Sequence, residues 1–124
     1  MNLPKSDYYL SIISTKQHPY IELITEGKKK AEGRVYSEKI RKFSANKTLC
    51  LYNKVSYVLC RIISLNVYKT FEEMLHQEGI SNMLPFTDSF DEAIKIYNSF
   101  PGSERVKTYG AVAIVLEPIE KSYA

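Results

Sequence analysis

The residues best suited to chemistry form a short run between Gly27 and Arg34. Three lysines, Lys28, Lys29 and Lys30, precede Glu32 and Arg34. Because Glu32 and Arg34 are two residues apart, both side chains would point to one face of a strand. An arginine can bind a phosphate or a base edge through two donors, and a carboxylate can orient a lysine or a base amine. The run therefore indicates either a cleft that binds an anion or an exposed ion pair.

Basic residues continue after this run. Seven of the 17 lysines and arginines fall within residues 28–42, whereas the net charge of the whole chain is only +3. A surface that contacts phosphates needs such a cluster. The alternative is a solvated surface, in which lysines at the end of a helix are favoured by its dipole. Charge alone does not separate these two interpretations.

Glu78 is the most informative acid in the second half of the chain. Phe71, Met74 and Leu75 mark the apolar stripe of a helix, and Glu78 falls on the same stripe. A carboxylate is costly to bury without a partner. We therefore expect Glu78 to face the cleft and to pair with Lys29 or Arg34. In the alternative, the helix frays near Gly79 and the carboxylate turns to solvent.

A charged connector, residues 103–108, precedes the last strand. If it overhangs the cleft, Arg105 and Lys107 extend the basic path. Tyr36 and Tyr109 could stack on bases, since every base offers a π-face. The ordinary alternative is a solvated loop, and most of the ten tyrosines must be structural.

The cysteines and histidines of the sequence do not indicate a metal site or a redox centre. Cys50 and Cys60 lie among apolar residues and lack metal-ligand spacing, so we interpret them as buried thiols. With His18 and His76 far apart, no zinc site is expected. We predict that no cofactor is required, with weakly bound Mg²⁺ or Mn²⁺ on Glu32 and Glu78 as the one metal alternative.

The elements that must hold these residues begin with strands. We predict a strand at residues 8–13, a short helix that starts at Pro19 and stops at Gly27, and a second strand within residues 28–37. Residues 48–52 and 56–68 are expected to be strands joined by a turn at residues 53–55. Imperfect alternation predicts a bulge near residues 63–64.

Two helices and a final strand complete the order. Thr70 with Glu73 and Ser89 with Glu92 both fit the capping box. Pro85 interrupts the segment between the helices. The apolar run at residues 109–116 predicts a last strand that is buried on both sides. This order indicates one α+β domain over residues 1–124, a small β-barrel with helices across its openings.

The N-terminus lacks the apolar block of a signal peptide, and no apolar run approaches the roughly 20 residues that span a bilayer. We therefore expect a cytoplasmic or nuclear protein without a membrane partner.

The run at residues 27–34 resembles the ASCH signature, which is Gly, any residue, Lys, two residues, Glu or Thr, any residue, Arg. Segments of the second half follow the order and spacing of ASCH proteins, and the likeness covers nearly the whole chain. These segments are residues 70–75, 78–79, 84–85, 93–97 and 109–114. One departure is residues 44–47, where many ASCH proteins have a Gly-Asp turn; Asn46 can adopt the same left-handed conformation.

The resemblance implies a PUA-like β-barrel with a cleft where the first helix meets the barrel. Related members are associated with RNA binding. Some are ribonucleases, and some bacterial relatives remove the acetyl group of N4-acetylcytidine with a Lys, a Thr and a Glu. The Lys falls on Lys29 and the Glu on Glu78, but the Thr position is Glu32. A carboxylate cannot attack a carbonyl as a hydroxyl does, which disfavours the amidohydrolase reaction.

Three functions follow, in this order. The first is binding of RNA or a nucleoside in a basic cleft by Lys28, Lys29, Lys30, Arg34, Arg105 and Tyr109. The second is hydrolysis with Lys29, Glu32 and Glu78 as catalytic residues, in which a ribonuclease is favoured over an amidohydrolase. The third is a protein-interaction domain that retains a vestigial site.

Overall fold

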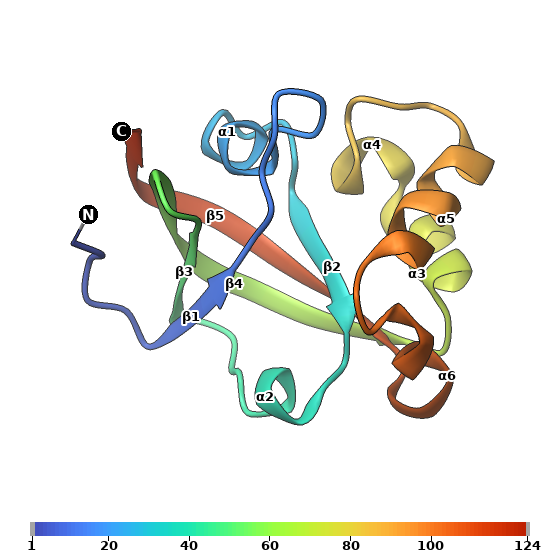
Figure 1. The fold of residues 1–124 in the computed structure, drawn as a ribbon. Coiled ribbons are helices and arrows are strands. Elements are labelled where there is room, and N and C mark those ends of the chain that lie inside the picture. Colours follow the sequence, from blue (N-terminus) through green and yellow to red (C-terminus); the bar gives the residue numbers. More distant parts are fainter. Residues whose placement is uncertain (1, 124) are drawn as a thin grey trace.

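The computed structural model describes residues 2–123, and Figure 1 shows how their elements are arranged. The elements alternate between short helices and strands, and the two longest strands come from the middle and the end of the chain. In chain order they are β1 (Tyr8–Ser11), α1 (Tyr20–Thr25), β2 (Ala31–Val35), α2 (Glu38–Arg41), β3 (Thr48–Tyr52), β4 (Ser56–Tyr68), α3 (Phe71–Glu78), α4 (Ile80–Met83), α5 (Phe90–Ser99), the 3₁₀ helix η1 (Ser103–Arg105), α6 (Val106–Tyr109) and β5 (Ala111–Tyr123).

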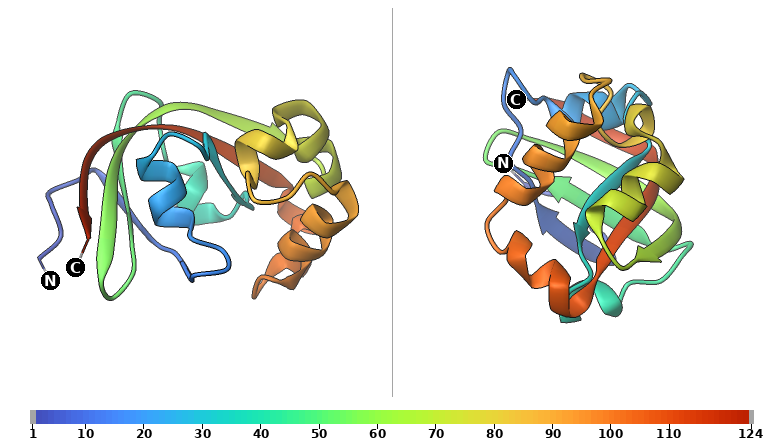
Figure 2. Two further views of the ribbon diagram at one scale, coloured as in Figure 1. Left: turned by 90° about the horizontal axis from the view of Figure 1, so that it is seen from above. Right: turned by 90° about the vertical axis from the view of Figure 1, so that its right-hand side faces the viewer.

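The strands form one five-stranded sheet in the order β1-β3-β4-β5-β2. β1 pairs in parallel with β3, and the other neighbours are antiparallel. The register of β4 against β5 shifts between Leu59 and Cys60 and again between Ile62 and Ser64. Because such irregularities bend a strand, the long pair curves into a half-barrel (Figure 2). The predicted α+β barrel and its bulge near residues 63–64 are confirmed.

The core fills the concave side of this sheet. α1 lies inside the curve of β4 and β5 and contributes the fully buried Ile21 and Ile24 (Figure 2). The helices from α3 to α6 gather beyond one end of the sheet, with Met74 and Leu75 buried (Figure 1). Both capping boxes are confirmed: Thr70 Oγ accepts from the amide of Glu73 at 3.0 Å, and Ser89 Oγ from that of Glu92 at 3.2 Å.

Several boundaries differ from the prediction. β2 begins at Ala31 because the amides of Lys28 and Lys29 both donate to Leu23 O, which closes the end of α1. The connector predicted as a loop forms η1 and α6, so Tyr109 ends a helix instead of starting the last strand. Gly110, with a φ of 80°, then redirects the chain into β5.

Other local expectations are met. Asn46 adopts the expected left-handed conformation, with a φ of 69°. Cys50 and Cys60 are buried, as expected of core thiols. Two further elements, α2 and α4, arise in stretches for which the sequence predicts no helix. Within residues 2–123, no helix combines the length and apolar character needed to cross a bilayer.

Candidate functional site

The centre of the site is β2, an edge strand of the sheet. It pairs with β5 on one side only, with Glu32 opposite Ile114 and Arg34 opposite Val112. Its side chains alternate, so Glu32 and Arg34 share a face as predicted. Glu32 is 7% exposed, which is unusual for a carboxylate and indicates that its charge is balanced locally.

That balance comes from two cations. Lys29 Nζ lies 3.5 Å from Glu32 Oε1, and Arg34 Nε donates to Glu32 Oε2 at 2.9 Å. Both carboxylate oxygens are therefore engaged. We call these three residues the ion triad. The structure thus brings together in space three residues that the sequence places near one another on the chain.

Lys29 is the most deeply buried member of the triad, at 2% exposed. Its ammonium group also donates to Met83 O at 2.5 Å and lies 5.3 Å from the centre of the Tyr20 ring. Burial lowers the pKa of Lys29, while the negative charge of Glu32 opposes that shift. The ammonium is therefore stabilised in its buried position mainly by the carboxylate of Glu32 and the carbonyl of Met83.

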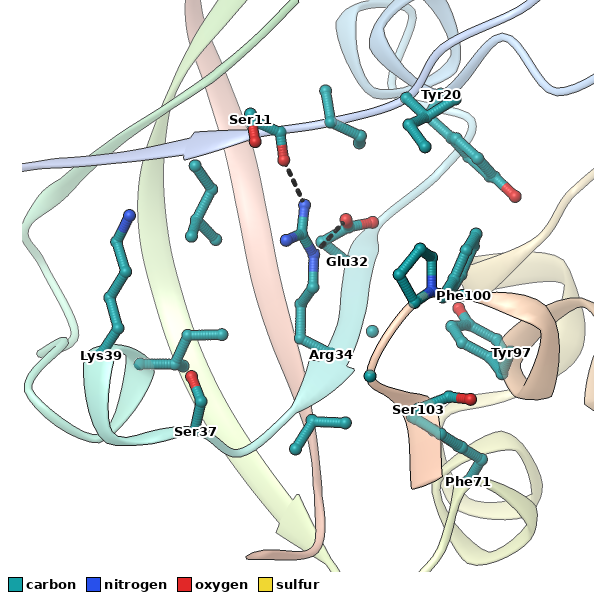
Figure 3. A pocket seen from close by; sticks show the side chains of 18 of the residues that line it. Ser11, Tyr20, Glu32, Arg34, Ser37, Lys39, Phe71, Tyr97, Phe100 and Ser103 are labelled. Carbon is teal, nitrogen blue, oxygen red and sulfur yellow. Dashed lines mark hydrogen bonds and ion pairs between the residues drawn. The ribbon is translucent and has the colours of Figure 1, made fainter. Parts of the chain in front are cut away.

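Arg34 also connects the two edge strands of the sheet. Its Nη2 donates to Ser11 O at 2.8 Å, and Ser11 ends β1, which is the other edge strand (Figure 3). No strand pairing connects β1 to β2 in the sheet order. Among the described residues, this guanidinium therefore bridges the seam at which the half-barrel stays open.

A cleft of about 730 Å³ opens along this seam. Its walls come from β1, β2, α2, the turn between β3 and β4, and the segment from Phe100 to Arg105 (Figure 3). Five of its lining residues are basic and one is acidic. The basic ones are Lys29, Arg34, Lys39, Lys54 and Arg105, and the acid is Glu32. Ile12, Ile13, Phe100 and Pro101 supply apolar wall.

Two tyrosines of the cleft carry buried hydroxyl groups. Neither Tyr20 nor Tyr97 has a hydrogen-bond partner for its hydroxyl within the described chain. Burial and then the charge of Glu32 raise the pKa of Tyr20 to about 12, and the same causes hold the pKa of Tyr97 well above its ordinary value. Both hydroxyls therefore stay protonated at neutral pH. Helical spacing in the sequence marks these residues as core, which they also are.

Of the residues predicted for the site, Lys29, Glu32, Arg34 and Arg105 line the cleft. Lys28, Lys30 and Tyr109 are not among its lining residues. Lys28 is exposed and lies 3.8 Å from Glu26, while Lys30 uses its amide to bond Asn82 O. Sequence reasoning missed Lys39 and Lys54 as lining residues, and only the neighbouring basic run hinted at Lys39.

The expected position of Glu78 is wrong. Its Oε2 accepts a hydrogen bond from Asn66 Nδ2 at 2.8 Å and another from the hydroxyl of Tyr68, and it does not line the cleft. The helix presents Glu78 to β4, where neutral donors satisfy the carboxylate. The stripe was thus identified correctly, but the partners on the facing strand were not foreseen.

This placement also gives separate partners to Glu32 and Glu78, the two carboxylates of the weak-metal alternative. Glu32 bonds within the triad, and Glu78 bonds to β4. Among the residues the structure describes, no group of three or more His, Cys, Asp or Glu side chains could hold a metal ion.

Comparison with known proteins agrees with the fold and the motif. The model of the ASCH domain matches residues 15–120. The crystal structure of the hypothetical protein PH0355 is 40% identical, with a TM-score of 0.79 over 90% of this chain and 98% of that one. The solution structure of PF0455 from Pyrococcus furiosus is 35% identical, with a TM-score of 0.71 over 91% and 97%. No curated protein matches the chain.

Proposed function

The chain belongs to the ASCH domain family, and from this premise we propose that its cleft binds single-stranded RNA, with an unstacked nucleotide in the cleft and its phosphates at the basic rim. The observation that carries the proposal is the charge of the lining, where five basic residues face one carboxylate. Glu32 is already neutralised inside the triad, so the cations of the rim remain available to an anion.

Arg34 is suited to hold a phosphate or a base edge at the inner end of the cleft. Its described bonds use Nε and Nη2, which leaves the Nη1 donors, and its side chain is 28% exposed. Two anchored nitrogens fix the plane of the guanidinium before a ligand arrives. A pre-oriented donor binds with a smaller entropy cost.

The apolar wall suits a base that has left its stack. Ile12, Phe100 and Pro101 line the cleft, and Ile13 is 66% exposed although its side chain is aliphatic. A flat heteroaromatic ring can cover such surface while the phosphate stays in solvent near Lys39 and Lys54. RNA-binding proteins recognise splayed-out bases in this way.

The test is binding of a fluorescein-labelled oligouridylate to the purified protein over a range of salt concentrations. Affinity should fall as salt rises, and Lys54→Ala and Arg105→Ala should each weaken binding and reduce the salt slope by about one. Lys95→Ala is the matched control because Lys95 is exposed on α5 and outside the lining. Affinity that ignores salt, or an equal loss in the control, would contradict the proposal.

A hydrolase remains the second candidate, and one observation favours it. Lys29 has a pKa lowered by burial and lies 3.5 Å from a carboxylate oxygen of Glu32, as a lysine base and its proton partner would. In this version Glu32 takes the part that was expected of Glu78.

The hydrolase is tested by incubating the protein with single-stranded RNA, with and without Mn²⁺, and with N4-acetylcytidine. Turnover should disappear in Lys29→Met and persist in Glu78→Gln. Intact RNA and untouched acetylcytidine in all mixtures would exclude it.

The third candidate, a protein-interaction domain with a vestigial site, requires Glu32, Arg34 and Glu78 to point apart. Glu32 and Arg34 instead bond to each other, and only Glu78 departs. The geometry therefore gives this candidate the least support.

A further inference from the structure

We propose that Tyr36, Arg41 and Tyr109 form a second nucleic-acid site, a stacking platform for the base that follows the one in the cleft. The proposal rests on the proposed RNA binding and extends it from a single nucleotide to the path of the strand. Tyr36 directly follows β2, Arg41 ends α2 and Tyr109 ends α6, and hydrogen bonds of Arg41 join the three segments.

The guanidinium of Arg41 is the centre of the platform. Its Cζ lies 4.5 Å from the centre of the Tyr36 ring and 5.9 Å from that of the Tyr109 ring. Both distances are within the range of cation–π attraction. The guanidinium covers one face of each ring, so the surface on which a base would stack is the opposite face of the exposed Tyr109 ring.

Main-chain bonds hold this surface in place. Arg41 Nε donates to Tyr36 O at 3.1 Å, and its Nη2 donates to Tyr109 O at 3.3 Å. The arginine is therefore oriented by two carbonyl groups that no side-chain substitution removes. This arrangement also allows the rings to be changed without breaking the connection between α2 and α6.

The platform is exposed where a ligand needs it to be. Arg41 is exposed, Tyr109 is 37% exposed and Tyr36 is half-buried. An aromatic ring left in water by folding gains more from stacking than a buried one, because it has apolar surface still to cover.

Local charge favours an anionic strand. Residues 36–42 and 104–109 contain five basic and two acidic side chains, a net charge of +3. These thirteen residues thus carry the same net charge as the whole chain of 124. The basic residues of this surface, Lys39, Arg41, Lys42, Arg105 and Lys107, are all exposed. Phosphates that flank a stacked base would lie among them.

Residues that line the cleft flank the platform residues in the sequence. Val35 and Ser37 line the cleft on either side of Tyr36, and Ile40 lines it immediately before Arg41. Arg105 lines the cleft four residues before Tyr109. Because Tyr109 follows Arg105 by about one helical turn along η1 and α6, we expect the base next to the one in the cleft to reach the Tyr109 ring.

A purely structural role is the alternative, in which Arg41 only clips α2 to α6. That role needs the two carbonyl bonds and not the Tyr109 ring. Tyr109→Ala keeps both bonds but loses the stacking surface, whereas Tyr109→Phe keeps the ring. If the platform binds RNA, the alanine variant should bind an octauridylate about tenfold more weakly, and the phenylalanine variant should bind as the wild type does. Equal affinity of all three would overturn the platform.

The decisive experiment uses the absence of tryptophan from the sequence. Tyr109→Trp introduces a single tryptophan, which can be excited selectively, at the platform, and Ile119→Trp introduces one at an exposed position of β5 as a control. Octauridylate should quench the indole of the Tyr109→Trp variant with the same midpoint as anisotropy binding of the labelled RNA. Uridine monophosphate, which fills only the cleft, should leave that emission unchanged. The Ile119→Trp variant should respond to neither ligand.

The outcomes separate the two proposals. RNA binding by anisotropy without quenching in the Tyr109→Trp variant, or equal quenching in the Ile119→Trp variant, overturns the platform and leaves the cleft proposal intact. Quenching that survives Arg34→Ala and Lys54→Ala unchanged supports the platform and contradicts the cleft. Absence of any RNA binding overturns both.

Discussion

Two glutamates, Glu32 and Glu78, are each held by two side chains, but the partners differ in charge. Glu32 bonds to the cations of Lys29 and Arg34 at the open seam of the half-barrel. Glu78 bonds to the neutral donors of Asn66 and Tyr68 beside β4. The first carboxylate is buried and the second is half-buried. Only the first lies in the cleft.

The difference shows what a charged partner adds. Glu78 is half-buried, so two neutral hydrogen-bond donors together with solvent are enough to stabilise its carboxylate. Glu32 is nearly dry, so its charge is tolerable only beside cations, and the cations in turn depend on it. The seam is therefore a coupled electrostatic unit, while the Glu78 cluster is a local contact. Each variant below breaks or sharpens this contrast, beginning with the largest effect.

Glu32→Ala should have the largest effect on stability. It leaves the ammonium of Lys29 buried beside Met83 O without a counter-charge, and a loss of about 3 kcal/mol in the free energy of unfolding is expected. Urea denaturation at neutral pH measures it. Adding Lys29→Met to the same variant should restore most of the loss, because the orphaned charge is then gone. If the double variant is no more stable than the single one, the triad is not a coupled unit.

Gly33→Ala tests the packing between the two strand residues of the triad. A Cβ at position 33 would lie 2.7 Å from Tyr97 Cε1 and 2.8 Å from Met74 Cε. These are the ends of side chains that can partly move, so a loss of about 1–3 kcal/mol is expected from overpacking. Thermal or urea unfolding measures it. Smaller partners, as in Gly33→Ala with Met74→Ala, should relieve part of the clash.

Glu78→Ala should cost less than either change at the seam. It removes an acceptor from Asn66 and Tyr68, both of which are half-buried and can turn to water. About 1 kcal/mol is expected for hydrogen bonds of this kind. The same variant should bind oligouridylate as the wild type does, which a filter or anisotropy assay checks. A binding defect would mean that Glu78 belongs to the cleft after all.

The smallest expected effect is the dependence of stability on alkaline pH through Tyr68, which bonds to Glu78. Burial and then the hydrogen bond to Glu78 raise the pKa of Tyr68 to about 12 from its ordinary value of 10.0. Between those values the native state keeps a proton that the unfolded state has lost, so stability falls as pH rises through this window. Tyr68→Phe should flatten that fall in urea titrations. In Glu78→Gln, phenolate absorbance should show that Tyr68 ionises at a lower pH than in the wild type. Tyr20 should still ionise at its raised pH, because the charge that acts on it is that of Glu32.

Local signals predicted much of the fold. The capping boxes of α3 and α5 are local in sequence, since the cap and the amide it accepts from are three residues apart. The imperfect alternation of apolar residues in β4, which predicted its bulge, is also a local signal. By contrast, α2 and α6 have four residues each, so they are too short for an apolar periodicity to reveal them.

The site divides in the same way. Lys29, Glu32 and Arg34 lie close together in the sequence, and strand alternation alone brings the last two to one face. The positions of Lys54, which was missed, and of Glu78, which was misplaced, depend instead on which segments the sheet order β1-β3-β4-β5-β2 brings together. That order includes a parallel pair between β1 and β3 that the local pattern did not reveal. Prediction therefore succeeded for near neighbours and was incomplete where long-range topology chose the partner.

The hydrogen bond from Arg34 to Ser11 O connects the two edge strands of the half-barrel in a different way from the other strand pairs. Neighbouring strands of the sheet are joined by ladders of several main-chain hydrogen bonds, whereas β1 and β2 are joined by one side chain with rotatable torsions. Parting it forfeits about one hydrogen bond and leaves every ladder intact. The two edge strands can therefore part at this point without breaking a main-chain ladder, while the hydrogen bond of Tyr8 to Lys42 O and its stacking on Phe43 still hold β1 to the segment that follows α2.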